Sequence, residues 1–326
     1  MRALLATALV ALLAPVAAAG ATPLTGPPRT AIFYYPWFGA PARDGAYQHW
    51  QQHDHAPPTD LASDYYPARG AYSSSNPAVL RAQMREIAAA GVEEVVSSWW
   101  GWGSPEDQRL SAVTQAARQA GIQVAVHIEP YPGRSVASVG ADIAHLRTLG
   151  MTDFFVYRAG DFPAADWAQV NATLSGVRVF AQTALPGFAA AARFSGLYTY
   201  DILLYGGGTF ERICSEAHRL HLLCGPSVGP GYDATRATGD LRVKARRNGA
   251  TYDGMWRAAL AAGADLVTIT SYNEWNEGTQ IEPASSAVHG KYESYARAYG
   301  LSGTAAQLAY LARTAYWTDM LRTLSR

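Results

Sequence analysis

The chain has 326 residues, with 26 basic and 26 acidic side chains and a formal net charge of zero. A balanced chain without runs of one charge is a poor partner for nucleic acid, and it favours a neutral substrate. Hydrophobic residues make up 49% of the sequence, which is ample for a core. The length fits one large α/β domain or two small ones, and the absence of an internal repeat or linker favours one.

Residues 1–21, MRALLATALVALLAPVAAAGA, have the form of a secretory signal peptide: one Arg, an apolar stretch interrupted by Pro15, and small residues at the end. A single membrane anchor is the alternative, but the segment is short, rich in alanine and lightly flanked. We therefore expect a secreted protein, extracellular or periplasmic, that consists of residues 22–326. We expect it to be a monomer without a membrane segment.

Eight short apolar runs, each followed by Gly, Pro or polar residues, predict strands at 30–35, 92–99, 123–128, 153–158, 177–182, 196–200, 220–228 and 265–272. Helical patterns lie between most of them, as at 76–91, 104–121, 141–150 and 251–263. This alternation predicts parallel strands joined by right-handed crossovers, and eight such units fit a (β/α)8 barrel. A doubly wound open sheet is the alternative, but no Gly-rich phosphate-binding turn follows the first strand.

The segment from Gly39 to Asn76 shows no strong periodicity. A loop of this length in a compact domain is usually functional or disordered, and its aromatic content argues against disorder. We expect it to form a wall of an active-site cleft.

Cys214 and Cys224 are the two cysteines of the chain and lie ten residues apart. In an exported protein we expect them to form one disulfide that closes a short loop. Redox chemistry would usually use a closer spacing, and a zinc site would need more ligands.

Polar and aromatic residues follow several predicted strands, in the sequences HIEPYPGR after the third and SYNEWNEGTQIEP after the eighth. The carboxyl ends of barrel strands meet at one mouth, where active sites are built. Carboxylates at two strand ends, surrounded by aromatic rings, suit glycoside hydrolysis, because one group can protonate the glycosidic oxygen while another assists at the anomeric carbon. The candidates are Glu129, Glu274 and Glu277 as carboxylates, with His127, Tyr131, Tyr232, Asn273 and Trp275 as substrate contacts.

Each of these carboxylates could instead be an ordinary surface or ion-paired residue. This alternative is weakest for Glu274 and Glu277, because two carboxylates three residues apart beside Trp275 would repel each other on a surface without a function. It is strongest for Glu282, which lies further along the chain next to a proline. His127 has no second histidine at ligand spacing, so a metal centre is not expected, and we predict no cofactor.

Several blocks carry a resemblance to a known family: FYYPWFGAPARDGAYQHW, SSWWGWG, HIEPYPGR, GLYTY, PSVGPGYDATR, RRNGATYDGMW and, above all, ITSYNEWNEGTQIEPA. Together they resemble glycoside hydrolase family 99, the endo-α-mannosidases and endo-α-mannanases, in the order of that family from about residue 31 to residue 285. The resemblance implies a (β/α)8 catalytic domain at 22–326 that needs no metal. It also implies an α-mannan or high-mannose-type glycan as substrate.

The resemblance also implies roles for individual residues. Glu277 would be the general acid and then the base that activates water. Glu274 would deprotonate the 2-hydroxyl of the sugar, which attacks the anomeric carbon and leaves a 1,2-anhydro sugar, so the configuration is retained. Four residues would surround the mannose units: Tyr35, Trp100, Glu129 and Tyr200. The tryptophan at position 100 is more like that of the bacterial mannan-cleaving members.

Two other functions remain open from the residues alone. One is a retaining glycosidase of another neutral glycan, with Glu129 as acid/base and Glu274 as nucleophile. The other is a secreted sugar-binding barrel without catalysis, which we would expect to have lost a carboxylate at position 274 or 277.

Overall fold

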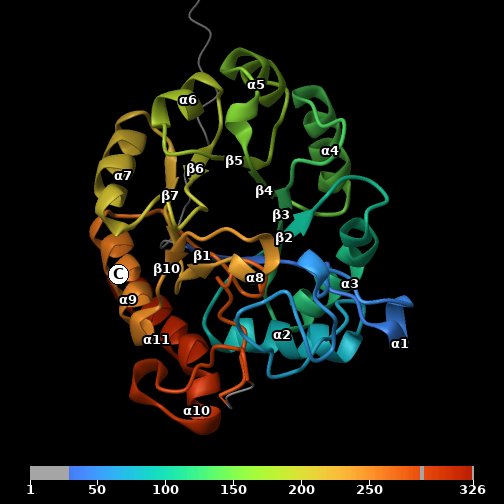
Figure 1. Cartoon of the computed structure of the whole chain (residues 1–326). Coiled ribbons are helices and arrows are strands. Elements are labelled where there is room, and N and C mark those ends of the chain that lie inside the picture. Colours follow the sequence, from blue (N-terminus) through green and yellow to red (C-terminus); the bar gives the residue numbers. More distant parts are fainter. Residues whose placement is uncertain (1–28, 287–289, 325–326) are drawn as a thin grey trace, which may run out of the picture.

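The computed structural model describes residues 29–286 and 290–324 (Figure 1). The signal peptide predicted at residues 1–21 lies outside this range. Within it, no helix is both long enough and apolar enough to cross a membrane.

Nine parallel strands form the central sheet of the described residues, in the order β7-β6-β5-β4-β3-β2-β1-β11-β8. Their side chains are almost continuously buried, as expected for a parallel sheet covered on both faces. The bounds are β1 Arg29–Tyr34, β2 Glu94–Trp99, β3 Gln123–Ile128, β4 Asp153–Val156, β5 Arg178–Gln182, β6 Gly196–Tyr198, β7 Leu223–Gly225, β8 Ser227–Val228 and β11 Leu266–Ile269.

The seventh predicted strand, 220–228, is divided into β7 and β8 at Pro226. Proline has no N–H to donate to a neighbouring strand, which accounts for the interruption. The carbonyl groups of Cys224 and Pro226 still accept hydrogen bonds from the backbone of Asp265 and Thr268, each at 3.1 Å. These bonds join the two edges of the sheet, so the predicted (β/α)8 barrel is confirmed and the open sheet is excluded.

Helices surround the strands as a ring (Figure 1). The larger ones are α2 Pro77–Ala89, α3 Pro105–Gln119, α4 Val136–Thr148, α5 Ala164–Asn171, α6 Pro186–Ala191, α7 Phe210–Arg219, α9 Ala250–Ala261 and α11 Ala309–Leu324. The short elements are α1 Pro41–Asp44, α8 Thr235–Thr238, α10 Gly303–Gln307, the 3-10 helices η1 Gln52–Asp54, η2 Ala159–Asp161, η3 Gly207–Thr209, η4 Arg247–Gly249 and η5 Ala298–Gly300, and the antiparallel pair β9 Tyr232–Asp233 and β10 Val243–Lys244.

The predicted helices at 76–91, 104–121 and 251–263 correspond to α2, α3 and α9. Helix α4 begins five residues before the predicted start at 141. Ser135 and Ser138 form a reciprocal capping box there. Gly140 disfavours a helix in the sequence, so the first turn was not predicted. The glycine is needed for packing, because a Cβ at this position would lie 2.7 Å from the side chain of Val170 on α5.

The barrel interior contains a separate hydrophobic cluster that includes Phe33, Phe155, Phe180, Tyr198 and Tyr200. Larger clusters lie outside, between the strands and the helices. Aromatic side chains thus fill the barrel up to its mouth, where the polar strand-end residues begin.

The predicted disulfide is present. It joins Cys214 on α7 to Cys224 on β7, with a Cα–Cα distance of 5.2 Å.

Candidate active site

The loop of residues 271–283, SYNEWNEGTQIEP, covers the carboxyl end of the barrel directly after β11. The start and the end of the loop are hydrogen-bonded to each other: the N–H of Ser271 donates to the carbonyl of Thr279 at 2.9 Å, and the hydroxyl oxygens of these two residues also lie 2.9 Å apart. The N–H of Tyr272 donates to the carbonyl of Phe33 on β1 at 2.9 Å. The loop is therefore fixed to the barrel, with Glu274 and Glu277 on its closed turn.

The segment from Gly39 to Asn76 lies against this loop, in line with its expected position beside the cleft. The Nδ2 group of Asn276 donates to the carbonyl oxygens of His49 and Ala62, at 3.2 and 3.0 Å. Trp50 and Tyr72 of the same segment are buried in the core. The segment thus supports the 271–283 loop from outside the barrel.

Asn273 and Trp275, predicted as substrate contacts, lie beneath the surface, and both are fully buried. The Asn273 side chain accepts from the N–H of Tyr35 at 2.7 Å and donates to its carbonyl at 2.9 Å. The indole N–H of Trp275 donates to Glu282 Oε2 at 2.8 Å. Because their polar groups are bound by the protein, these two residues position the loop and do not line the cleft.

Glu282 is also fully buried, but it has a full set of partners. Besides Trp275, its carboxylate is bound by Arg69 at 3.1 Å, the Tyr72 hydroxyl at 2.7 Å and the Gln83 amide at 2.8 Å. A buried charge that is paired and hydrogen-bonded in this way is structural. The third carboxylate of the motif thus has the ordinary role that its sequence position favoured.

Glu274 and Glu277 differ from Glu282 because neither forms an ion pair within the described residues. Glu274 is 3% exposed, and its Oε1 accepts the N–H of Asn276 at 3.0 Å. Burial and the charge of Glu277 raise the pKa of Glu274 well above its usual value. Burial, Asp201 and Glu129 together raise the pKa of Glu277 to about 7. Glu277 can therefore exchange a proton near neutral pH, and Glu274 holds its proton more strongly than an ordinary glutamate, which suits a pair that does acid/base chemistry.

Tyr200 and Tyr35 extend this group across the mouth. The hydroxyl oxygens of the two tyrosines lie 2.5 Å apart, and the Tyr200 hydroxyl donates to Glu277 Oε2 at 3.4 Å. Tyr200 has a φ of 54°, in the left-handed region that disfavours a bulky residue. Its N–H donates to the Ser227 hydroxyl at 2.7 Å, and its carbonyl accepts from the Thr270 hydroxyl at 3.0 Å, which holds the backbone there. The fold thus maintains a strained backbone that directs this hydroxyl to Glu277.

Glu129, directly after β3, is nearly buried and accepts from the Ser98 hydroxyl at 2.9 Å. The same hydroxyl accepts from the indole N–H of Trp100 at 3.2 Å, so Trp100 and Glu129 share one support. His127 lies beneath Glu129, with Nδ1 2.8 Å from the carboxylate and Nε2 2.8 Å from the Tyr198 hydroxyl. His127 is only 1% exposed, which makes it a positioning residue here and not the substrate contact that was predicted.

The two remaining predicted contacts occupy the margins of the mouth. The Tyr131 hydroxyl points away to α4, where it binds Ser138 at 2.9 Å and also Asp142, so it is not available for a substrate. Tyr232 on β9 is half-buried, and its pKa is raised by burial and by Glu277. The N–H of the next residue, Asp233, donates to the carbonyl of Glu277 at 2.8 Å. Tyr232 therefore lies beside Glu277 and Tyr131 does not.

Two residues of the site were not predicted. Tyr157 follows β4 as Glu129 follows β3, and its ring lies 5.1 Å from that of Tyr200. Asp201 follows Tyr200 and contributes to the raised pKa of Glu277. Tyr157 directly follows β4 and Asp201 lies three residues after the end of β6, and this strand-end position is the signal that could have found them.

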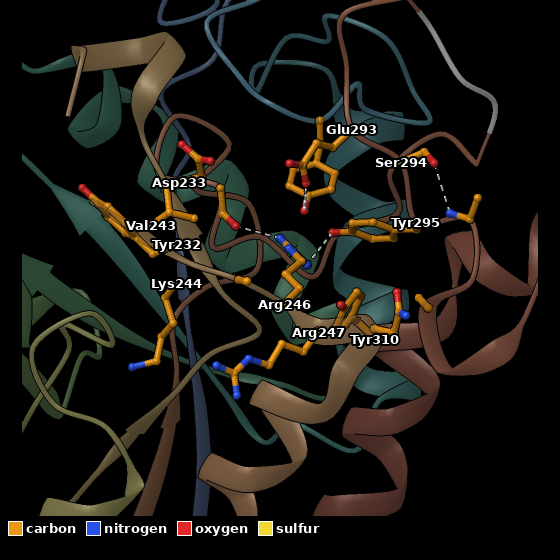
Figure 2. A pocket seen from close by; sticks show the side chains of 16 residues that line it. Tyr232, Asp233, Val243, Lys244, Arg246, Arg247, Glu293, Ser294, Tyr295 and Tyr310 are labelled. Atoms are coloured by element: carbon orange, nitrogen blue, oxygen red, sulfur yellow. Dashed lines mark hydrogen bonds between the residues drawn. The ribbon is translucent and has the colours of Figure 1, made fainter. Parts of the chain in front are cut away.

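Arg246 supports the loop from the other side of Glu277. Figure 2 shows its guanidinium next to Tyr295, in a pocket of about 270 Å³ that Tyr232 and Gly278 also line. Its Nη2 donates to the carbonyl oxygens of Gly278 and Gln280, at 2.8 and 2.7 Å. The rings of Tyr65, Tyr295 and Tyr310 lie 4.6 to 5.0 Å from its charge. Arg246 thus holds the chain directly after Glu277 without pairing with a carboxylate.

Comparisons with known proteins show the family of the chain. The family model described as Glycosyl hydrolase family 99 matches residues 28–323. The chain belongs to glycosyl hydrolase family 99. This confirms the predicted family and shows that the protein is a glycoside hydrolase.

Relatives of this family 99 enzyme include vertebrate and bacterial proteins. A "Glycoprotein endo-alpha-1,2-mannosidase-like protein" of Danio rerio is 33% identical, over 78% of this chain and 70% of that protein. The "Glycoprotein endo-alpha-1,2-mannosidase" of Xenopus laevis is 30% identical, over 81% and 72%. The solved structure of the GH99 endo-alpha-mannosidase from Bacteroides thetaiotaomicron superposes with a TM-score of 0.82 at 30% identity, covering 91% of this chain and 98% of that one.

Proposed function

We propose that this family 99 hydrolase is a retaining, endo-acting α-mannosidase or α-mannanase. The observation that carries the proposal is the pair at the barrel mouth, the buried Glu274 and the partly buried Glu277, neither of which has a cation partner among the described residues. The names of the relatives, endo-α-mannosidases in animals and in a bacterium, support α-mannose as the sugar. Two carboxyls with raised pKa values support acid/base catalysis.

In the first step, Glu274 takes the proton of the 2-hydroxyl, and O2 attacks the anomeric carbon. The bond to the leaving oxygen breaks, and Glu277 gives its proton to that oxygen. In an α-mannoside both groups are axial and trans, so O2 already lies behind the bond that breaks. Attack within one ring gains the advantage of intramolecularity, which offsets the strain of the 1,2-anhydro sugar.

In the second step, Glu277 takes a proton from water, and the resulting nucleophile opens the anhydro ring at the anomeric carbon. Glu274 returns its proton to O2. Two inversions give net retention, and both carboxyls return to their starting protonation states. The raised pKa of Glu277 suits the acid role, and burial makes Glu274 a stronger base once it is ionised.

The sugars around these carboxyls are proposed to contact Tyr35, Trp100, Glu129 and Tyr200. Tyr157 is proposed as a further contact, because its ring lies beside that of Tyr200. We further propose that residues 1–21 direct secretion, that 22–326 act as one catalytic domain, and that the enzyme works as a monomer on an α-mannan or high-mannose-type glycan.

Substrates altered at C2 test the mechanism. A matched 2-deoxy mannoside should bind but not react, and Glu274→Gln should retain binding while losing catalysis. If Glu274 or Glu129 instead attacks carbon directly, an activated 2-deoxy-2-fluoro mannoside should leave a glycosyl ester on one of them. Detection of that ester by mass spectrometry on competent enzyme would exclude internal attack by O2.

A further inference from the structure

Trp102 lies on a tight turn that follows β2 at the same end of the barrel as Glu129. Gly101 and Gly103, on either side of it, have φ values of 91° and 74°, which favour glycine. A Cβ at Gly101 would also lie 3.1 Å from the ring of Tyr131. The turn therefore depends on both glycines and places Trp102 beside helix α4.

Helix α3 fixes this turn through Asp107 and Gln108. The N–H of Gly103 donates to Asp107 Oδ2 at 2.9 Å, and its carbonyl accepts from the Gln108 amide at 3.0 Å. The other oxygen of Asp107 accepts from the indole N–H of Trp99 at 2.8 Å. Both the N–H and the carbonyl of Gly103, the residue after Trp102, are thus hydrogen-bonded to α3.

The side chain of Trp102 is also held. Its indole N–H donates to Asp142 Oδ1 at 3.0 Å, and the second oxygen of Asp142 accepts from the Tyr131 hydroxyl. Asp142 is only 4% exposed, and the ring of His145 lies 3.7 Å from that of Trp102 at an angle of 50°. Trp102 is nevertheless 59% exposed.

This combination of order and exposure distinguishes Trp102 from the other tryptophans. The chain has nine, all within the described residues, and Trp102 alone is exposed. Folding gains little from a large apolar ring that stays in water. A rigid aromatic surface instead benefits binding, because its conformational entropy is lost before the ligand arrives.

We propose that Trp102 is a sugar-binding platform that takes a further neutral hexose unit of the glycan, beyond the units at Glu274 and Glu277. The flat indole face suits the C–H face of a pyranose ring, and no ionic group of the ligand is required. Trp102 lies two residues after Trp100, a separation of at most roughly 7 Å along the chain. Trp100 in turn shares the Ser98 hydroxyl with Glu129, so the platform continues the cleft on its β2–β3 side.

The proposal rests on the proposed function and predicts a dependence on chain length. Trp102→Leu should fill the space against His145 but has no flat face, so the increase in KM over wild type should grow with the glycan. We expect roughly a two- to tenfold increase on α-mannan and the smallest increase on the shortest manno-oligosaccharide that the wild type cleaves. Trp102→Phe, which keeps an aromatic face, should lie between Leu and wild type on α-mannan.

Leu149, which is 51% exposed just beyond the carboxyl end of α4, provides the control for an exposed apolar side chain that does not follow a barrel strand. Leu149→Ala should give wild-type KM values on both substrates. Equal KM ratios for Trp102→Leu on the long and short substrates, or no change on either, would overturn the platform while the proposed function stands. A wild type that cleaves neither substrate would overturn both.

Discussion

At the amino ends of the strands, Glu94 and Asp153 are buried beside arginines, whereas at the carboxyl ends the buried Glu274 and the partly buried Glu277 have no arginine partner within the described residues. Asp153 accepts from Arg178 at 2.7 and 2.6 Å and from Arg29 at 2.6 Å. Burial opposes ionisation of Asp153, but these hydrogen bonds and charges lower its pKa below the usual value. One protein thus buries carboxylates in two ways within the same barrel.

This comparison separates stability from chemistry. Asp153, which is bound by two arginines, has a lowered pKa and ties strands together, whereas Glu274 and Glu277 have raised pKa values and can exchange a proton. Glu94 lies between these cases, because burial and the charge of Asp153 raise its pKa to about 8 although Arg29 lies 3.8 Å away. Glu282 is at the carboxyl ends of the strands, yet it is bound by Arg69 as Asp153 is bound by its arginines, although burial still raises its pKa. Burial and the partners of a carboxyl together set its pKa, which the motif alone does not reveal.

The largest expected effect comes from Glu277→Gln at the catalytic end. Without a general acid, cleavage of natural glycan should fall about 10²- to 10⁴-fold. A substrate whose leaving group needs no proton should keep much of its rate. Rates on an aryl α-mannoside with a good leaving group and on glycan provide the measurement, and equal losses on both would remove Glu277 from the acid role.

At the amino end, Asp153→Asn should lower the free energy of unfolding by about 3–5 kcal/mol, because it removes the buried charge that two partly buried arginines share. The kcat of the folded enzyme should remain near that of wild type. Chemical denaturation and kinetics below the transition test both statements, with exposed Glu211→Gln on α7 as the control. A loss of kcat at unchanged stability would contradict the separation of the two ends.

The smallest effect is a shift in pH dependence from Asp201→Asn. Asp201 raises the pKa of Glu277, so removing its charge should lower that pKa. The acid must be protonated, so the high-pH limb of kcat/KM, near pH 7 in the wild type, should move to lower pH. The amide can still accept the backbone N–H groups of Leu203 and Leu204, both at 2.9 Å. An unmoved limb, or the same shift in Glu211→Gln, would show that Glu277 does not set it.

Local sequence patterns determined the barrel, its strands and the motif that carries the carboxyls, because burial periodicity and strand-end position are properties of neighbouring residues. Only the tertiary structure decided which carboxyls are free. Gln83 reaches Glu282 across 199 residues, and Asn273 binds the backbone of Tyr35 across 238. Tyr157 and Asp201 likewise reach Glu277 only because parallel strands converge. Charge compensation and desolvation depend on such distant neighbours, which spacing along the chain does not reveal.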